Sequence, residues 1–298
     1  ILFYLDIGMS VKTYFMSLSR LALVQVVSSG HPCTSGSPNI DYFISSKYAE
    51  SEDSDKYYSE RLIRLNKANT NYSKPEIKNS TFILSSLNIS EGEFIMGIPH
   101  RLFKFHPDFD DILEKILEEI PHARLLFFEG ITKYETKELL SRWERDNSYI
   151  LNRLITCPSV KFDDYLAISK RFDIVLDPFY FGMGNTFFQA MNFGIPVVSM
   201  KTDQNRGRCV YAGYKQMGIE KPPIASTPEE YISICKKLAF NESYKKHLTK
   251  QILIKSKEIF NNKTIHKEYI QFFEKSIEAA KNNELLPLKW KPNIGYIL

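Results

Sequence analysis

Short apolar runs alternate with amphipathic segments along most of the chain. Runs rich in β-branched residues predict strands, as in LVQVVSS at 23–29 and IPVVSM at 195–200. Segments whose apolar residues recur every three or four positions predict helices, as in HPDFDDILEKILEEI at 106–120. Strands that alternate with helices are typical of a doubly wound parallel sheet, so the pattern favours an α/β fold.

The expected elements form two groups on either side of a polar, Asn- and Lys-rich segment at 66–80, which we interpret as an interdomain linker. The expected strands are 1–8, 23–29, 40–46, 62–65, 93–98, 123–130, 153–157, 173–177 and 195–200. The expected helices are 11–21, 53–61, 106–120, 133–145, 162–171, 185–193, 205–217, 227–240 and 242–281, the last with a break near 261–262.

Composition narrows the function classes. The chain has 298 residues, enough for two domains, and its net charge of +4 is no evidence for nucleic acid binding. No apolar run approaches the roughly 20 residues of a membrane span. The four cysteines lack CxxC or metal-ligand spacing, which fits a reducing compartment, so we expect a cytoplasmic protein. The first residues, ILFYLDIG, lack signal-peptide features and read as a strand, so we expect a piece of a larger protein.

The segment DPFYFGMGNTFFQAMNFGIPVVS at 177–199 predicts a strand end, a Gly-rich elbow and a helix. Gly182 and Gly184 permit backbone angles that other residues reach only with strain. Asn185 and Thr186 are expected to open the helix, and both side chains can cap it. The backbone N–H groups of such a helix start form an anion site. An ordinary, well-capped turn is the alternative.

The stretch PHRLFKFHPDFDD at 99–111 places Lys104 in a loop after a strand. Since ligands of doubly wound sheets bind outside the carboxyl ends of strands, this lysine can reach an anion in the same crevice. A solvated lysine is the alternative. Asp108 and Asp110 form a DxD pair, but their place at a helix start favours capping over a metal site, and we interpret Asp163 and Asp164 in the same way.

Two residues near the start of the chain are candidate general bases. His31, in the loop GHPCTSG, can act as a base or as an oxyanion donor, or it can be a hydrogen-bonded turn residue. Asp6 ends the first expected strand, and its alternative role is to cap the helix that starts near residue 11. The other histidines show no metal-ligand spacing.

Four stretches occur together and in order: GHPCTSGSPNIDYFISS, RLFKFHPDFDDIL, DIVLDPFYFGMGNTFFQAMNFGIPVVSM and RGRCVYAGYKQMGI. Together they resemble the catalytic region of the O-GlcNAc transferase-like glycosyltransferases, over about residues 1–280. The resemblance implies a GT-B fold, in which two Rossmann-like domains bind a UDP-sugar. It implies a partial acceptor-side domain at 1–75, a UDP-sugar-binding domain at 80–262, and a C-terminal helix and tail at 263–298 that return to the first domain.

The resemblance also implies roles for single residues. Lys104 matches the family lysine that contacts the diphosphate, and Thr186, with the backbone of Gly184 and Asn185, matches the turn around the β-phosphate. Asp177 ends the strand before that turn and belongs to the same expected donor site. His31 falls in the loop on the sugar and acceptor side. The segment that holds uracil and ribose is matched by Ser159, Val160 and Tyr165.

The chain departs from the family pattern at three positions. Gln189 stands where relatives carry an acidic residue toward the ribose, and an amide hydrogen-bonds hydroxyls less strongly than a carboxylate. Arg101 stands where a smaller or neutral residue is usual, and it can support the diphosphate or block part of its site. Gly184 replaces the histidine of the eukaryotic branch, which fits the bacterial branch better.

The resemblance implies an inverting transferase that moves a hexose or GlcNAc from a UDP-sugar to a protein side chain, with no metal and no cofactor. A retaining transferase of the glycogen-synthase type should carry two glutamates eight positions apart, where this chain has Phe181 and Gln189. A second alternative is a non-catalytic subunit that binds a partner chain or the missing N-terminal segment. A dinucleotide-dependent enzyme is disfavoured because no strand is followed by GxGxxG.

Overall fold

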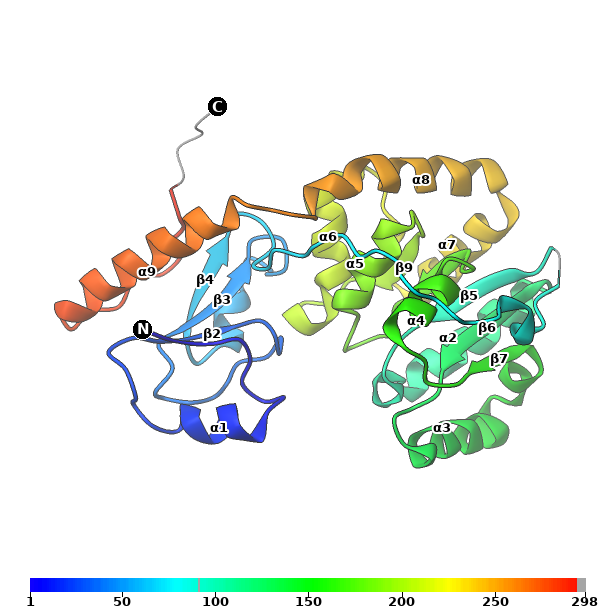
Figure 1. Ribbon diagram of the computed structural model, residues 1–298, viewed down its shortest axis with the longest axis horizontal. Helices are drawn as coiled ribbons and strands as arrows, with labels where there is room; N and C mark the ends of the chain where they lie inside the picture. The colour runs from blue at the N-terminus through cyan, green and yellow to red at the C-terminus, as the bar shows by residue number, and fades with distance from the viewer. Residues whose placement is uncertain (91, 294–298) are drawn as a thin grey trace. The chain divides into compact units, whose positions relative to one another are not determined.

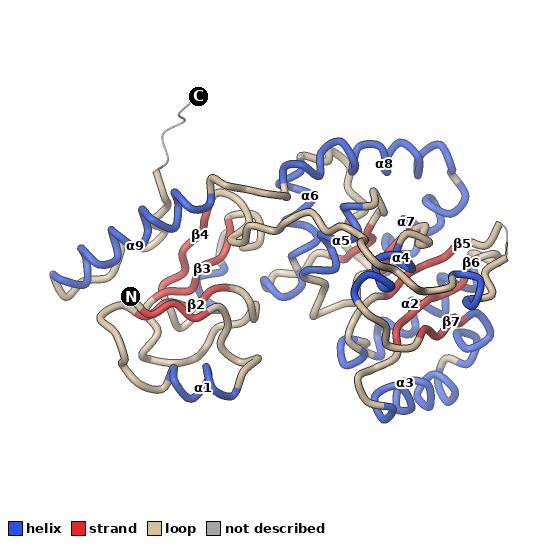
Figure 2. The backbone as a smooth tube through the Cα atoms, viewed as in Figure 1, coloured by secondary structure: helices blue, strands red, loops and turns tan. Residues whose placement is uncertain are grey.

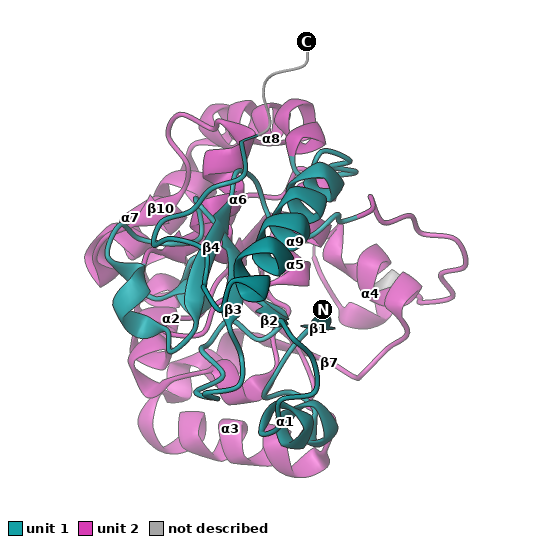
Figure 3. Ribbon diagram, turned by 90° about the vertical axis from the view of Figure 1, so that its left-hand side faces the viewer, with its two compact units in different colours: residues 1–72, 202–208, 259–298 teal, residues 73–201, 209–258 magenta. Residues whose placement is uncertain are grey.

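The computed structural model describes residues 1–90 and 92–293, and the chain divides into two compact units (Figures 1 and 3). Unit 1 comprises residues 1–72, 202–208 and 259–298, and unit 2 comprises residues 73–201 and 209–258. Strands and helices alternate along most of unit 2, as the sequence predicts, whereas in unit 1 β2 is followed directly by β3 (Figure 2).

Unit 1 is built on a four-stranded sheet in the order β1-β2-β3-β4, in which every neighbouring pair is parallel. Its strands are β1 (Leu2–Tyr4), β2 (Gln25–Ser28), β3 (Tyr42–Ser46) and β4 (Arg61–Leu65). Because side chains alternate between the faces of a strand, Val26 and Val27 of β2 enter two different hydrophobic clusters, one on each face.

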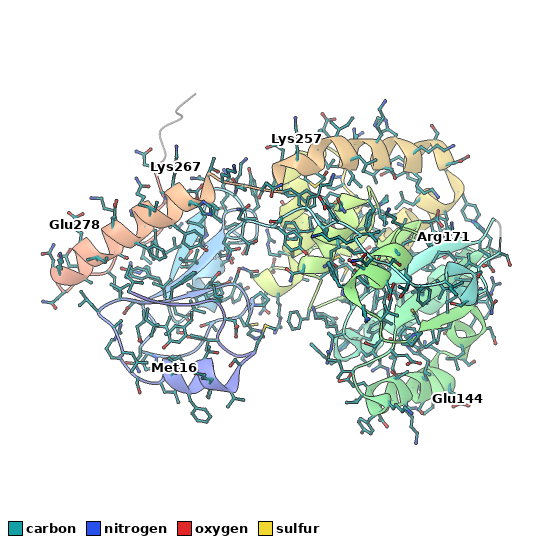
Figure 4. All side chains as sticks on the ribbon, in the orientation of Figure 1. Met16, Glu144, Arg171, Lys257, Lys267 and Glu278 are labelled. Atoms are coloured by element: carbon teal, nitrogen blue, oxygen red, sulfur yellow. The ribbon has the colours of Figure 1, made fainter. Side chains whose placement is uncertain are left out.

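Helix α9 (Ile265–Lys281) covers one face of this sheet with the buried side chains of Ile265 and Phe272. Its outer face is mostly polar and carries the exposed Lys267 and Glu278 (Figure 4), together with the exposed Ile270. On the other face, Met16 of α1 (Val11–Ser17) packs against the second cluster. The sheet of unit 1 thus has a helix on each side.

Two helices expected in unit 1 are shorter than the sequence predicts. α1 ends at Ser17, although the pattern predicted a helix to residue 21. The segment 53–61 contains only the 3-10 turn η1 (Ser54–Tyr57). There the Ser54 hydroxyl accepts a hydrogen bond from the backbone N–H of Ser51, and such local side-chain bonds compete with helix formation.

Unit 2 is built on a six-stranded parallel sheet in the order β10-β9-β8-β5-β6-β7. The chain starts in the middle at β5, winds outward through β6 and β7, and then returns to β8 and winds the other way. This is a doubly wound topology with its switch point between β5 and β8. The strands are β5 (Phe94–Ile98), β6 (Ala123–Phe128), β7 (Leu154–Cys157), β8 (Ile174–Leu176), β9 (Val197–Met200) and β10 (Ile224–Ala225).

The helices of unit 2 match most of the expected segments. They are α2 (Pro107–Glu119), α3 (Lys133–Asp146), α4 (Phe162–Ser169), α5 (Asn185–Asn192), α6 (Cys209–Met217), α7 (Pro228–Phe240) and α8 (Glu242–Lys255). The short strand β10 was not predicted, and neither were the 3-10 turns η2 (Leu84–Leu87), η3 (Leu102–Lys104) and η4 (Ser148–Arg153).

Two long helical predictions are wrong in extent. The helix expected over 205–217 is the 3-10 turn η5 (Asn205–Gly207) followed by α6, and the helix expected over 242–281 ends at Lys255. The 3-10 turn η6 (Ser256–Glu258) and a non-helical stretch then lead to α9. The interruption therefore covers 256–264, whereas the sequence predicted a break only near 261–262.

The segment 202–208 belongs to unit 1, although β9 before it and α6 after it belong to unit 2. Within unit 1, the Asn205 amide donates to the Ser45 hydroxyl at 2.8 Å and also to the buried Glu50 carboxylate. The Arg208 guanidinium donates to the backbone carbonyl of Ala49 at 2.8 Å. The segment is therefore fastened to unit 1 by hydrogen bonds to β3 and the loop after it.

Candidate active site

Two loops of unit 2 flank the switch point of its sheet. One follows β5 and carries Lys104, and the other follows β8 and forms the elbow at 177–184 before α5. Loops at the carboxyl ends of strands beside a switch point form the usual ligand crevice of such sheets. The topology therefore brings the predicted lysine and the predicted elbow to the same place.

Asp177 holds the elbow in shape. Its carboxylate, 2% exposed, accepts hydrogen bonds from the Met183 backbone N–H at 2.7 Å and from the Ser199 hydroxyl at 2.6 Å. Burial raises the pKa of Asp177 to about 6, while both bonds and the charge of Lys104 act in the opposite direction. A Cβ atom on Gly182 would lie 2.9 Å from an Asp177 oxygen, so only glycine fits without a shift.

The start of α5 differs from the sequence prediction. The N-cap is Gly184, and no side chain among the described residues caps the helix, whereas Asn185 and Thr186 were expected to do so. They are instead the first two helical residues, with Asn185 exposed and Thr186 partly exposed. The Phe187 N–H donates to the Gly184 carbonyl at 3.0 Å, so the N–H groups of Asn185 and Thr186 and the positive end of the helix dipole are the features that suit an anion.

Lys104, at the end of η3, reaches across to the elbow. Its ammonium donates to the Gly182 carbonyl at 2.7 Å and lies 4.2 Å from the centre of the Phe181 ring. Burial lowers the pKa of Lys104, and the nearby charge of Asp177 opposes this shift. The contact with Gly182 places the lysine beside the residues that lead into α5.

Two further side chains complete the surroundings of Lys104, and the sequence prediction missed both. His100, 8% exposed, donates through Nε2 to the Leu176 carbonyl at 3.2 Å. Burial and the charge of Lys104 lower its pKa to about 3, so its 4.0 Å approach to Asp177 is not an ion pair. The Cys209 sulfur lies 3.9 Å from the Gly184 carbonyl, and burial raises the pKa of this thiol to about 12.

Arg101, Asp108 and Asp110 contact side chains other than those that the sequence analysis expected. The Arg101 guanidinium lies 3.5 Å from the carboxylate of Glu135 on α3. Asp110 is buried and pairs with Arg142 at 2.7 Å, whereas the Asp108 carboxylate accepts a hydrogen bond from the Tyr180 hydroxyl at 2.5 Å. The helix start is capped by neither aspartate, because the His106 side chain is the N-cap of α2 and accepts from the Asp108 N–H.

The residues expected around uracil and ribose lie in unit 2 beyond β7. Ser159 is exposed and Val160 partly buried in the loop after β7, and Tyr165 on α4 lies 5.2 Å from the ring centre of Phe128. Gln189 lies on α5, one turn after Asn185, and is only 7% exposed.

Asp163 and Asp164 do not cap the helix on which they lie, since the N-cap of α4 is Lys161 without a side-chain bond. Asp164 instead accepts from the N–H groups of Thr81 and Phe82, and Asp163 accepts from the N–H of Asn79. The pair therefore fastens residues 79–82, at the end of the predicted linker, to α4.

The two candidate bases lie together in unit 1. Asp6 follows β1 and His31 follows β2, and these parallel strands are neighbours. A Cβ atom on Gly8 would lie 3.0 Å from the His31 ring, and one on Gly30 would lie 3.2 Å from the Asp6 Cβ, so the two loops pack directly. Asp6 does not cap α1, whose N-cap is Ser10. Its Oδ1 atom is buried without a hydrogen-bond partner among the described residues.

No group of three or more His, Cys, Asp or Glu side chains within 1–90 and 92–293 is arranged to hold a metal ion. Over the same residues, no helix combines the length and apolar character needed to cross a membrane.

Comparison with known proteins places these features in context. No protein-family model matches the chain. It is 28% identical over 260 residues to the UDP-glucose:protein N-beta-glucosyltransferase of Actinobacillus pleuropneumoniae, an alignment that covers 85% of this chain and 40% of that protein. It is 26% identical over 249 residues to the probable UDP-N-acetylglucosamine–peptide N-acetylglucosaminyltransferase SPINDLY of Hordeum vulgare, covering 80% of this chain and 25% of that protein.

Among solved structures, a mutant O-GlcNAc transferase of Thermobaculum terrenum superposes with a TM-score of 0.80 and 22% identity. The match covers 95% of this chain and 54% of that one, and it establishes the GT-B fold. The chain thus spans between a quarter and about half of the length of these three proteins. The chain is thus similar over most of its length to proteins named as protein glucosyltransferases and peptide N-acetylglucosaminyltransferases, and it shares their fold class with a solved O-GlcNAc transferase.

Proposed function

We propose that this chain binds a UDP-sugar and transfers its hexose or GlcNAc to a protein side chain, with inversion and without a metal. The observation that carries the proposal is the convergence of Lys104 and the uncapped start of α5 on one elbow at the switch point. Two relatives also support the proposal. One is named as a transferase that moves glucose from UDP-glucose to protein, and the other as a probable transferase that moves N-acetylglucosamine from its UDP derivative to peptides.

In the proposed reaction the acceptor attacks the anomeric carbon, the bond from that carbon to the diphosphate oxygen breaks, and UDP leaves with the electron pair. Negative charge therefore grows on the β-phosphate. The Lys104 ammonium and the first N–H groups of α5, at Asn185 and Thr186, are fixed donors for that charge. Such preorganised donors stabilise a transition state because no solvent has to reorient around the new charge.

We assign the remaining donor contacts by proposal. Ser159, Val160 and Tyr165 would hold uracil and ribose, and Gln189 would act toward the ribose. Asp177 would contribute by keeping the elbow in shape, because its carboxylate already accepts the Met183 N–H and the Ser199 hydroxyl. Arg101 would contribute to the diphosphate only after leaving Glu135.

On the acceptor side, we propose His31 or Asp6 as the general base. Either group can accept a proton from a nucleophilic hydroxyl or amide at the moment of attack. The packing of their two loops supports placing both residues in one acceptor region. Replacing each separately, as His31→Ala and Asp6→Asn, and measuring transfer at saturating UDP-sugar decides between them.

The test of the donor site is calorimetric titration of UDP, UDP-glucose and UDP-GlcNAc in the presence of EDTA. We expect binding by the wild type and clearly weaker binding by Lys104→Ala. Lys250→Ala is the matched control, because Lys250 is an exposed lysine on α8. The sugar nucleotide with the lower Kd identifies the donor.

Failure of the folded wild type to bind any of the three compounds would overturn the proposal. It would favour the second candidate function, a non-catalytic subunit that binds a partner. One observation favours that candidate, namely the large apolar side chains that unit 1 exposes near its first strand and helix. These include Leu5, Met9, Val11, Phe15 and Leu23.

We also propose a cytoplasmic location. All four cysteines are free thiols, two buried and two partly buried, which is the state expected in a reducing compartment.

A further inference from the structure

Phe181 lies in the elbow at a position that the backbone fixes tightly. The residue before it, Tyr180, has a φ of 68°, in the left-handed region that non-glycine residues adopt only at a cost. The Tyr180 hydroxyl is held by Asp108 at 2.5 Å, and the Phe181 N–H donates to the Phe179 carbonyl at 2.7 Å. These bonds hold the backbone from which the Phe181 side chain projects.

The ring of Phe181 contacts the ammonium of Lys104. The distance from Nζ to the ring centre is 4.2 Å, well within the range of a cation–π interaction. The same ammonium donates one hydrogen bond to Gly182, the next residue along the chain. Because an ammonium has three donors, two remain for a ligand when the ring and Gly182 hold it.

The chemistry of this partner matters because Lys104 is partly buried, and burial lowers its pKa. A carboxylate at this distance would hold the ammonium strongly, but its negative charge would also repel a diphosphate. An aromatic face attracts the cation through its quadrupole and carries no net charge. Phe181 therefore stabilises the ammonium without adding a second negative charge to that of the nearby Asp177.

We propose that Phe181 is a positioning residue, which orients the Lys104 ammonium toward a bound diphosphate through a cation–π contact. The proposal rests on the proposed function, since it assigns Phe181 a part in UDP binding. It also gives a physical role to the position at which a retaining transferase would carry a glutamate.

The test replaces Phe181 with mono-, di- and trifluorophenylalanine by stop-codon suppression and measures the Kd of UDP calorimetrically with EDTA present. Fluorine changes the size of the ring little but progressively removes its negative face. We expect UDP affinity to fall stepwise, by about 2- to 30-fold over the series, while the thermal unfolding midpoint changes little.

Two controls separate the cation–π contact from packing. In a Lys104→Met background the same fluorinated residues should leave the UDP affinity unchanged. The same series at Phe103, whose ring centre lies 6.2 Å from that of Phe181, should also have no effect. An equal decline at Phe103, or a decline that persists without the lysine, would overturn the proposal.

The outcomes for this proposal and for the donor site are distinguishable. If the wild type binds UDP and Lys104→Met weakens binding, but fluorination of Phe181 changes nothing, the positioning role is wrong and the donor site stands. If the wild type does not bind UDP, both fail.

Discussion

The two units use the same kind of sheet but wind it differently. In unit 1 the strands follow chain order from β1 to β4, so the sheet has no point at which its winding reverses. In unit 2 the winding reverses between β5 and β8, and the loops that carry Lys104 and the elbow lie at that reversal. A reversal separates the helices that follow neighbouring strands and thereby opens a crevice.

The comparison bears on the proposal that unit 2 holds the donor site and unit 1 the acceptor side. The candidate residues of unit 2 include a cation and an uncapped helix start, whereas those of unit 1 are a carboxylate and an imidazole on two packed loops. The first set suits an anion and the second suits proton transfer. We therefore expect changes in unit 2 to alter donor affinity and changes in unit 1 to alter turnover.

The largest expected effect is that of Lys104→Met on catalysis. We expect the rate of UDP release from the preferred donor to fall by about 10²- to 10³-fold, the usual consequence of removing one preorganised donor. By contrast, His31→Ala should slow transfer but leave the Kd of UDP within about twofold, since the proposed donor site lies in unit 2. A large loss of UDP affinity in His31→Ala would contradict the assignment of donor binding to unit 2 and proton transfer to unit 1.

The next effect concerns the stability of the elbow. Gly182→Ala should lower the free energy of unfolding by about 1–3 kcal/mol, because the new methyl group would lie against the Asp177 carboxylate. Gly184→Ala is the matched control and should cost less, since a Cβ atom there meets no atom within 4 Å. Urea denaturation of both variants measures the difference, and equal losses would contradict the steric explanation.

A pH dependence follows from Asp177. Burial raises its folded pKa from 3.8 to about 6, so the folded state holds this proton more tightly than the unfolded state does. Its contribution to stability is therefore fully present below about pH 4 and is lost as the pH rises to about 6, with a total near 3 kcal/mol.

Asp177→Asn isolates this contribution, because asparagine cannot ionise. Denaturant titrations at several pH values should show the stability of the wild type falling relative to the variant between about pH 4 and pH 6. If the stability difference between wild type and Asp177→Asn does not change with pH, burial does not raise the pKa of Asp177 in the folded protein.

The smallest expected effect concerns the apolar surface of unit 1. Phe15 and Leu23 are 63% and 61% exposed, so Phe15→Ser and Leu23→Ser should change the free energy of unfolding by only about 0.5 kcal/mol. They should nevertheless reduce self-association, which light scattering detects, because exposed apolar patches promote it. A large loss of stability would show that these side chains are packed in solution.

Much of the fold was predictable because the spacing of apolar residues along the chain indicates strands and helices locally. The parallel α/β architecture is confirmed, and most helices of unit 2 lie where the pattern placed them. Errors concentrate where side chains compete with the backbone, as at Ser54, or where a helix changes into 3-10 turns, as at 205–207 and 256–258.

The candidate site was less predictable than the fold. Lys104 and the elbow carry a local signal, since each follows a strand. Cys209 carries none, because it meets the Gly184 carbonyl only after β9 and α6 bring two distant segments together. Side-chain partners also escaped prediction, as the capping of α2 by His106 and the bonds of Asp164 to 81–82 show.

The segment 202–208 has a consequence for how such a chain can be divided or recombined. The backbone passes between the two units four times, at 72–73, 201–202, 208–209 and 258–259. No single cut yields an intact unit, and excision of the continuous stretch 73–258 would separate Asn205 and Arg208 from their partners Ser45 and Ala49. Exchange of unit 2 between related chains must therefore conserve the seven residues 202–208, which interrupt unit 2 in the sequence but belong to unit 1.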